Sequence, residues 1–176
     1  KVDHIYYLAP GHDSEGKAWY AGTSPQGLFK SEDGGDTWNS VAGFNSNPHW
    51  GKWTANSPDG YPKVPKLHSI LIDPMDKNHM YIGMSYGGIF ESEDQGKTWE
   101  PLNGGLKADY LKGSPKFGHD PHSLIFHPFE PGRLYQQNHC GIYFTKNGGK
   151  LWTEVFLKKG ISSYGFSLAI DEKNPA

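Results

Sequence analysis

The chain has 176 residues, of which 23 are glycine, 13 are proline and 14% are aromatic, a composition typical of a turn-rich all-β protein rather than a helical one. Its formal net charge of −2 gives no reason to expect binding to nucleic acid or to an anionic membrane, and no apolar stretch is long enough to span a bilayer. The single cysteine, Cys140, excludes an internal disulfide.

Four short strands recur in the same order along the chain. The first strand of each unit begins at a histidine and is expected over residues 4–10, 68–74 and 122–128. The second is expected over 18–22, 79–83 and 133–137, and the third over 27–29, 88–90 and 141–143. A fourth strand follows the next turn, as at 99–102 and 152–156. Four antiparallel strands per unit are typical of the blade of a β-propeller.

We therefore predict an all-β chain built of β-propeller blades. Blade 1 is expected over 1–43, blade 2 over 67–102, blade 3 over 122–158 and the start of a fourth over 164–176. Inserts over 44–66 and 103–121 separate these blades. Three blades cannot close a ring, so we expect a segment of a six- or seven-bladed propeller whose other blades lie in the same or another chain.

A turn with the pattern S/T-x-D/N-x-G-x-x-W separates the third and fourth strands of each unit. The Asp or Asn accepts hydrogen bonds from nearby backbone N–H groups, the glycine supplies a positive φ, and the tryptophan covers the turn. The turn residues are Ser31, Asp33, Gly35, Trp38, Ser92, Asp94, Gly96, Trp99, Thr145, Asn147, Gly149 and Trp152. Each turn has too few carboxylates for calcium, which takes about six to eight oxygen ligands, so a structural role is predicted.

These turns resemble the Asp-box, or bacterial neuraminidase repeat (BNR), of sialidases, xyloglucanase-type glycoside hydrolases and sortilin-like receptors. A longer signature over 118–124 and 137–143 resembles the bacterial propeller proteins described as BNR-repeat glycosyl hydrolases. The resemblance covers essentially the whole chain and implies a β-propeller with the boxes at its outer edge, away from any substrate. It implies no single activity, because these families include enzymes, receptors and assembly factors.

The enzyme interpretation can be tested against the residues present. Sialidases bind the substrate carboxylate with three arginines, whereas this chain has only Arg133, so sialidase activity is not expected. Hydrolysis of the xyloglucanase type needs two carboxyl groups about 5 to 10 Å apart. Asp120, which precedes an innermost strand, is the first candidate, and Asp3 is the second. In the alternative interpretation both carboxylates bind loop backbone.

Histidines occupy the same position at the start of three innermost strands, as His4, His68 and His122. Equivalent positions of a propeller converge around its central channel, and we expect His119 and His139 to lie near the third histidine. Several imidazoles at one rim could bind a transition metal or act as acid–base groups. Packing between blades is the favoured alternative, because Phe166 stands at this position in the fourth copy. No metal or other cofactor is therefore assigned.

The first insert carries aromatic residues that suit contact with a ligand. Trp50 and Trp53, with Tyr61 downstream, could stack on sugar rings or anchor a protein partner, or they could cap the gap between two blades. We predict a module that binds a glycan or a protein partner through the face at the channel mouth, with a glycoside hydrolase as the alternative. A periplasmic or secreted location is favoured over a cytoplasmic one.

Overall fold

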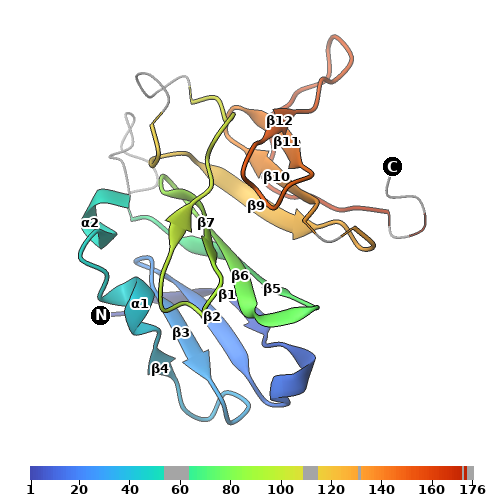
Figure 1. The fold of residues 1–176 in the computed structure, drawn as a ribbon. Helices are drawn as coiled ribbons and strands as arrows, with labels where there is room; N and C mark the ends of the chain where they lie inside the picture. Colours follow the sequence, from blue (N-terminus) through green and yellow to red (C-terminus); the bar gives the residue numbers. More distant parts are fainter. Residues whose placement is uncertain (54–63, 109–114, 131, 172, 174–176) are drawn as a thin grey trace.

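The computed structural model describes residues 1–53, 64–108, 115–130, 132–171 and 173, which form three four-stranded antiparallel sheets (Figure 1). The first sheet holds β1 (His4–Pro10), β2 (Trp19–Ser24), β3 (Leu28–Ser31) and β4 (Asn39–Ser40). The second holds β5 (Leu67–Asp73), β6 (Asp76–Met84), β7 (Gly88–Ser92) and β8 (Glu100–Pro101). The third holds β9 (Pro121–Phe126), β10 (Leu134–Asn138), β11 (Gly141–Thr145) and β12 (Thr153–Glu154). The predicted all-β fold of four-stranded antiparallel blades is confirmed.

Short helices lie in the segments that link the strands. They are η1 (Asp13–Glu15), α1 (Ala42–Asn45) and α2 (Trp50–Trp53). None of the helices in the described ranges has the length and apolar character needed to cross a membrane. Residues 164–171, expected to open a fourth blade, form no strand. In each sheet the innermost strand pairs with the next strand along the chain, and the described residues supply no such partner here.

The first strands of the three sheets are neighbours in space. β5 contacts β1 on one side and β9 on the other, so the three sheets lie side by side in the order in which they occur in the sequence (Figure 1). All three strands enter their sheets from the same end of this array. The residues at their beginnings therefore gather in one region, although they are separated by more than fifty positions in the sequence.

β6 packs against both neighbouring sheets because its side chains alternate. Met80 and Ile82 belong to a core shared with the first sheet, where Tyr20 also packs. Tyr81, between them, belongs to a core shared with the third sheet, where it joins Leu134. Successive side chains of a strand point to opposite faces, so this apolar run belongs to a strand that is buried on both sides.

The first Asp-containing turn is closed by side-chain hydrogen bonds. Ser31 Oγ accepts from the Gly35 N–H at 2.8 Å and donates to Asp33 Oδ1 at 2.7 Å. The Asp33 carboxylate accepts from the Thr37 N–H at 2.9 Å and from the Thr37 hydroxyl at 2.5 Å. Gly35 has a φ of 102°, which residues with a Cβ adopt only with strain. The sequence pattern thus corresponds to a defined set of bonds.

The other two turns show which parts of this arrangement can change. Asp94 repeats both bonds to Thr98, at 2.8 Å from the N–H and 2.6 Å from the hydroxyl. Asn147 accepts from the Leu151 N–H at 3.1 Å through its amide oxygen, and Leu151 has no hydroxyl to donate. An uncharged side chain therefore closes the third turn, while the first two turns use a carboxylate.

Acid is expected to weaken the first two turns and to leave the third unchanged. Hydrogen bonds, chiefly that from the Thr37 hydroxyl, hold the pKa of Asp33 well below its usual range. Burial opposes ionisation of Asp94, but its hydrogen bonds from Thr98 outweigh burial, and its pKa is lowered too. A carboxyl whose pKa is lower in the folded state stabilises the fold fully above its unfolded value. This stabilisation is lost as the pH falls below about 4.

We expect the double variant Asp33→Asn/Asp94→Asn to lose unfolding free energy more gradually than the wild type between about pH 5 and pH 2. Urea unfolding followed at several pH values measures this slope, which should decrease by up to about two protons. The control Glu32→Gln/Glu93→Gln removes the exposed carboxyl beside each turn and should keep the wild-type slope. Identical slopes for the wild type and the Asp variant would contradict this role of the turns.

Candidate functional site

Strand pairing identifies equivalent positions in the three innermost strands. In the second strands, the equivalent residues Gly22, Gly83 and Gln137 pair with Tyr7, Ser69 and Ser123 of the first strands. The residues immediately before these partners are Tyr6, His68 and His122. Tyr6, rather than His4, is therefore the structural equivalent of the two later histidines. His4 lies two residues earlier and is exposed.

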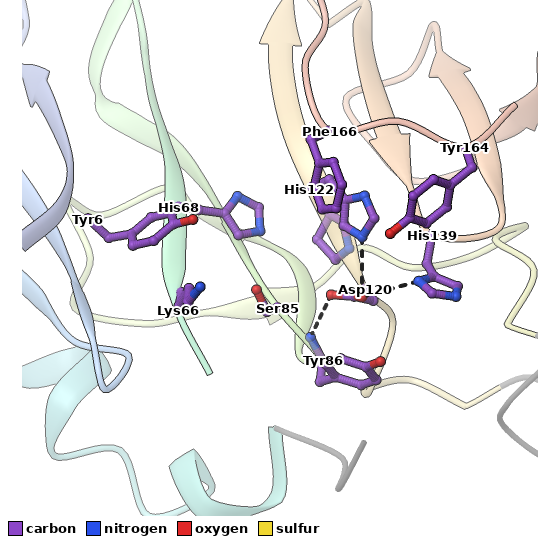
Figure 2. Close-up of a pocket in the computed structure, with 11 residues that line it drawn as sticks. Tyr6, Lys66, His68, Ser85, Tyr86, Asp120, His122, His139, Tyr164 and Phe166 are labelled. Atoms are coloured by element: carbon purple, nitrogen blue, oxygen red, sulfur yellow. Dashed lines mark hydrogen bonds and ion pairs between the residues drawn. The ribbon is translucent and has the colours of Figure 1, made fainter. Parts of the chain in front are cut away.

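These equivalent residues line one open pocket of about 280 Å³ at the beginning of the innermost strands (Figure 2). Tyr6, His68 and His122 contribute one side chain from each sheet, and Phe166 adds the corresponding residue of the following segment. The lining also contains polar side chains, namely Lys66, Ser85, Asp120 and His139. One repeat position thus supplies an aromatic or imidazole ring to the pocket four times.

Asp120 is the polar centre of this pocket. Its side chain is buried, and Oδ1 accepts a hydrogen bond from the Tyr86 N–H at 3.3 Å. Oδ2 faces two imidazoles, at 3.3 Å from His122 Nε2 and 3.6 Å from His139 Nδ1 (Figure 2). The His139 N–H also donates to the Asp120 carbonyl at 2.9 Å. The β9–β10 hairpin therefore holds the three side chains together.

His122 is held in place on several sides. Its Nδ1 lies 2.6 Å from the carbonyl of Gly165, and its ring stacks on Phe166 with centroids 4.7 Å apart and an interplanar angle of 17°. The Tyr164 ring meets it edge-on at 5.5 Å. Burial disfavours the charged imidazole, but hydrogen bonds to Asp120 and Gly165 outweigh burial and raise the pKa of His122.

His68 occupies the equivalent position in the second sheet but has the opposite electrostatic behaviour. Its side chain is buried, and its Nδ1 lies 3.0 Å from Ser69 Oγ. Burial lowers the pKa of His68 to about 4, so the ring is neutral at pH 7. The pocket therefore has a neutral imidazole in one wall and a carboxylate-paired imidazole in the other.

Other predicted site residues lie elsewhere. His119 points to the Pro115 carbonyl, which is 3.0 Å from its Nε2, and does not line the pocket. Asp3 is exposed, and its N–H donates to the Ser24 carbonyl. Sequence reasoning missed Tyr86 and Tyr164 as pocket residues. Tyr86 has a left-handed backbone conformation, with a φ of 54°, within the sequence Ser-Tyr-Gly-Gly. This glycine-rich turn is the signal in the sequence that could have pointed to Tyr86.

The tryptophans of the first insert pack inward. Trp53 is 3% exposed, and its ring centroid lies 5.5 Å from that of Phe44 and 5.0 Å from that of Phe90. Trp50 is half-buried at the edge of the same core. Trp53 therefore packs in the core between the first and second sheets, and its face is not open to a sugar. Tyr61 lies outside the described residues.

A second histidine–carboxylate cluster lies away from this pocket. Both ring nitrogens of His79 contact carboxylates, with Nδ1 2.8 Å from Asp73 Oδ2 and Nε2 2.8 Å from Glu91 Oε1. Burial opposes the charge, but the hydrogen bonds to Glu91 and Asp73 outweigh it and raise the pKa of His79. Because both nitrogens are engaged in links between β5, β6 and β7, the role of His79 is to join these strands.

Sequence comparison relates the chain to large proteins of two kinds. No protein-family model matches it. It is 30% identical over 86 residues to an oligoxyloglucan-reducing end-specific xyloglucanase of Emericella nidulans, covering 48% of this chain and 9% of the relative. It is 31% identical over 114 residues to vacuolar protein sorting/targeting protein 10 (Vps10) of Aspergillus fumigatus, covering 64% of this chain and 6% of the relative. Each match thus covers less than a tenth of the length of the curated relative.

Solved structures with a similar fold are also propellers. An ancestral GH74 enzyme matches 98% of this chain and 21% of its own with a TM-score of 0.64 and 15% identity. YCF48 from Cyanidioschyzon merolae matches 87% of this chain and 37% of its own with a TM-score of 0.55 and 15% identity. At such identities the likeness concerns the fold alone. Together, the three four-stranded sheets and these similarities show that the chain is part of a β-propeller, and its sequence is similar to the xyloglucanase and Vps10 relatives.

Proposed function

We propose that the protein is a glycan-binding propeller module and that the pocket around Asp120 receives the sugar. The observation that supports this proposal is the pairing of aromatic faces with polar groups in one open pocket. The rings of Tyr6 and Tyr164 are half exposed and offer apolar surface for the C–H face of a sugar, while Asp120 and Lys66 offer partners for its hydroxyls. The name of the xyloglucanase relative makes oligoxyloglucan the first ligand to test.

Binding is favoured over hydrolysis because the described residues of the pocket supply one carboxyl group, whereas hydrolysis needs two. Glycoside hydrolysis uses two carboxyl groups about 5 to 10 Å apart on either side of the bond. Among the described residues that line the pocket, Asp120 is the only carboxylate. The cavity of about 280 Å³ is also at the lower end of the range for small-ligand sites, which suits one or two sugar rings. A glycoside hydrolase remains the alternative, with Asp120 as its acidic group.

Titration with xyloglucan oligosaccharides tests this proposal. We expect saturable binding by isothermal titration calorimetry, and Tyr164→Ala should weaken it about tenfold because an aromatic face is lost. The control Phe156→Ala removes an exposed ring outside the pocket and should leave the affinity unchanged. Absence of saturable binding, or equal affinities for Tyr164→Ala and wild type, would refute the proposal. Release of reducing sugar that disappears in Asp120→Asn would instead support the hydrolase.

A further inference from the structure

We propose that Asp120, His122 and His139 bind a divalent transition-metal ion, with zinc as the type case. The three residues offer one carboxylate oxygen and two imidazole nitrogens, which lie within 4.8 Å of one another. Two imidazoles and one carboxylate are ligands that suit zinc and its neighbours in the first transition row. The proposal does not rest on glycan binding, because the ion needs only these side chains.

The distances between the ligand atoms fit a metal-centred arrangement. A tetrahedral zinc ion about 2.1 Å from each nitrogen or oxygen ligand places neighbouring ligand atoms about 3.4 Å apart. Asp120 Oδ2 is 3.3 Å from His122 Nε2 and 3.6 Å from His139 Nδ1, so two of the three edges already have this length. The third edge, between the two imidazole nitrogens, is at most 4.8 Å and shortens by a small shift of the rings when an ion binds.

The hydrogen bond to Gly165 prepares His122 as a ligand. A carbonyl oxygen can only accept, so the contact of 2.6 Å fixes the proton on His122 Nδ1. The lone pair of Nε2 in the neutral ring then points at Asp120 Oδ2. A cation between these two atoms takes the place of the proton that joins them when the ring is charged, so both atoms can ligate it. Metal-binding histidines commonly donate their second ring nitrogen to a carbonyl in this way.

The surroundings fix the ligands and leave room for a further one. Tyr86 holds the other oxygen of Asp120, and the Tyr164 ring contacts both imidazoles edge-on, at centroid distances of 5.5 Å to His122 and 5.4 Å to His139. Lys66, the cation of the pocket, lies over the Tyr6 ring on the opposite side (Figure 2). Three protein ligands at the edge of an open pocket leave a coordination position for water or a bound ligand.

This set differs from the metal site considered from the sequence. The repeat suggested His4, His68 and His122, one residue from each blade. The structure instead gathers three residues of the β9–β10 hairpin, two of them next to its ends. His4 is exposed and does not line the pocket, which makes His4→Ala a matched control for the proposed site.

Zinc titration of the metal-free protein tests the proposal without any sugar. We expect one ion per chain by isothermal titration calorimetry after removal of metals with a chelator. Variants His122→Ala, His139→Ala and Asp120→Asn should each weaken binding about 30-fold or more, since each removes a ligand. Asp120→Asn keeps an oxygen acceptor for the Tyr86 N–H, and circular dichroism should show that all three variants remain folded.

Two controls separate this site from surface histidines. His4→Ala tests the repeat histidines, and His49→Ala removes an exposed imidazole of the first insert. Both should bind zinc within about twofold of the wild type, since neither supplies a ligand. A stoichiometry well below one ion per chain, or wild-type affinity in His122→Ala and His139→Ala, would overturn the proposal.

X-ray absorption of the zinc-loaded wild type gives a test that needs no variant. We expect two imidazole nitrogens at about 2.0 to 2.1 Å and oxygen ligands at similar distance. A sulfur ligand at about 2.3 Å would place the ion on Cys140, next to His139, and would contradict the proposed ligand set. Coordination by oxygen alone would also contradict it.

Discussion

Replacing Trp152 with alanine is expected to lower the free energy of unfolding by about 3 to 5 kcal/mol. The Trp152 side chain is 2% exposed and packs in the core between the second and third sheets. Its Nε1–H donates to the Leu102 carbonyl at 2.7 Å, and its backbone N–H donates to the Gly104 carbonyl at 2.8 Å. The third turn, which Asn147 closes, is therefore attached to the chain that leaves the second sheet. Alanine would leave a cavity and an unsatisfied carbonyl at this junction.

Two further variants separate these contributions. Trp152→Phe keeps an aromatic ring but loses the indole N–H, so we expect a cost of about 1 to 3 kcal/mol. Leu151→Ala changes the preceding residue, which is 57% exposed, and should cost less than about 0.5 kcal/mol. Denaturant unfolding should be followed by circular dichroism, since these variants alter the tryptophan fluorescence. A cost for Trp152→Ala no greater than that for Leu151→Ala would refute the role of the junction.

Gly43→Ala is expected to destabilise the protein by about 3 kcal/mol, at the upper end of the usual cost of overpacking. A Cβ on Gly43 would lie 2.2 Å from the carbonyl oxygens of both Gly96 and Lys97. Both oxygens belong to the backbone of the second Asp-containing turn, so neither can move without displacing that turn. Gly43 thus allows α1 to approach the second sheet closely.

Gly51→Ala provides the matched control for this prediction. Gly51 lies in α2, and a Cβ there would have no heavy atom within 4 Å. Alanine favours helix over glycine, so this variant should be neutral or stabilising by up to about 1 kcal/mol. Thermal or denaturant unfolding of the two variants should therefore give shifts of opposite sign. Shifts of the same sign and size would show that α1 does not pack closely against the turn.

The order of the strands could be predicted because it is repeated in the sequence, and the fold confirms it. The register of the first strand could not be predicted from the sequence. The histidine and proline of 4–10 align with those of 68–74, yet pairing makes Tyr6 the equivalent of His68. A shift by two residues leaves every side chain on the same face, so the alternation of apolar residues does not distinguish the two registers. The irregularity between Ile5 and Tyr7 has no marker in the sequence.

The candidate site depends on contacts that repeats do not record. Asp120 and His139 lie nineteen positions apart and meet because β9 and β10 pair, which puts their residues at the same end of one hairpin. Tyr164 belongs to a segment without a strand in the structure, so no periodic pattern indicates that it reaches the pocket. Trp53 shows the converse case, since an aromatic residue in an insert gives no sign of whether it faces solvent or the core.

The alternating side chains of β6 have a consequence for cooperativity. A sheet that is buried on both faces depends on two neighbours, so separation of either neighbour exposes one row of its apolar side chains to water. In a nearest-neighbour description, the interface terms then outweigh the intrinsic stability of the single sheet. The three sheets should therefore unfold in one transition. A destabilising substitution in the first sheet should lower the hydrogen-exchange protection of the third.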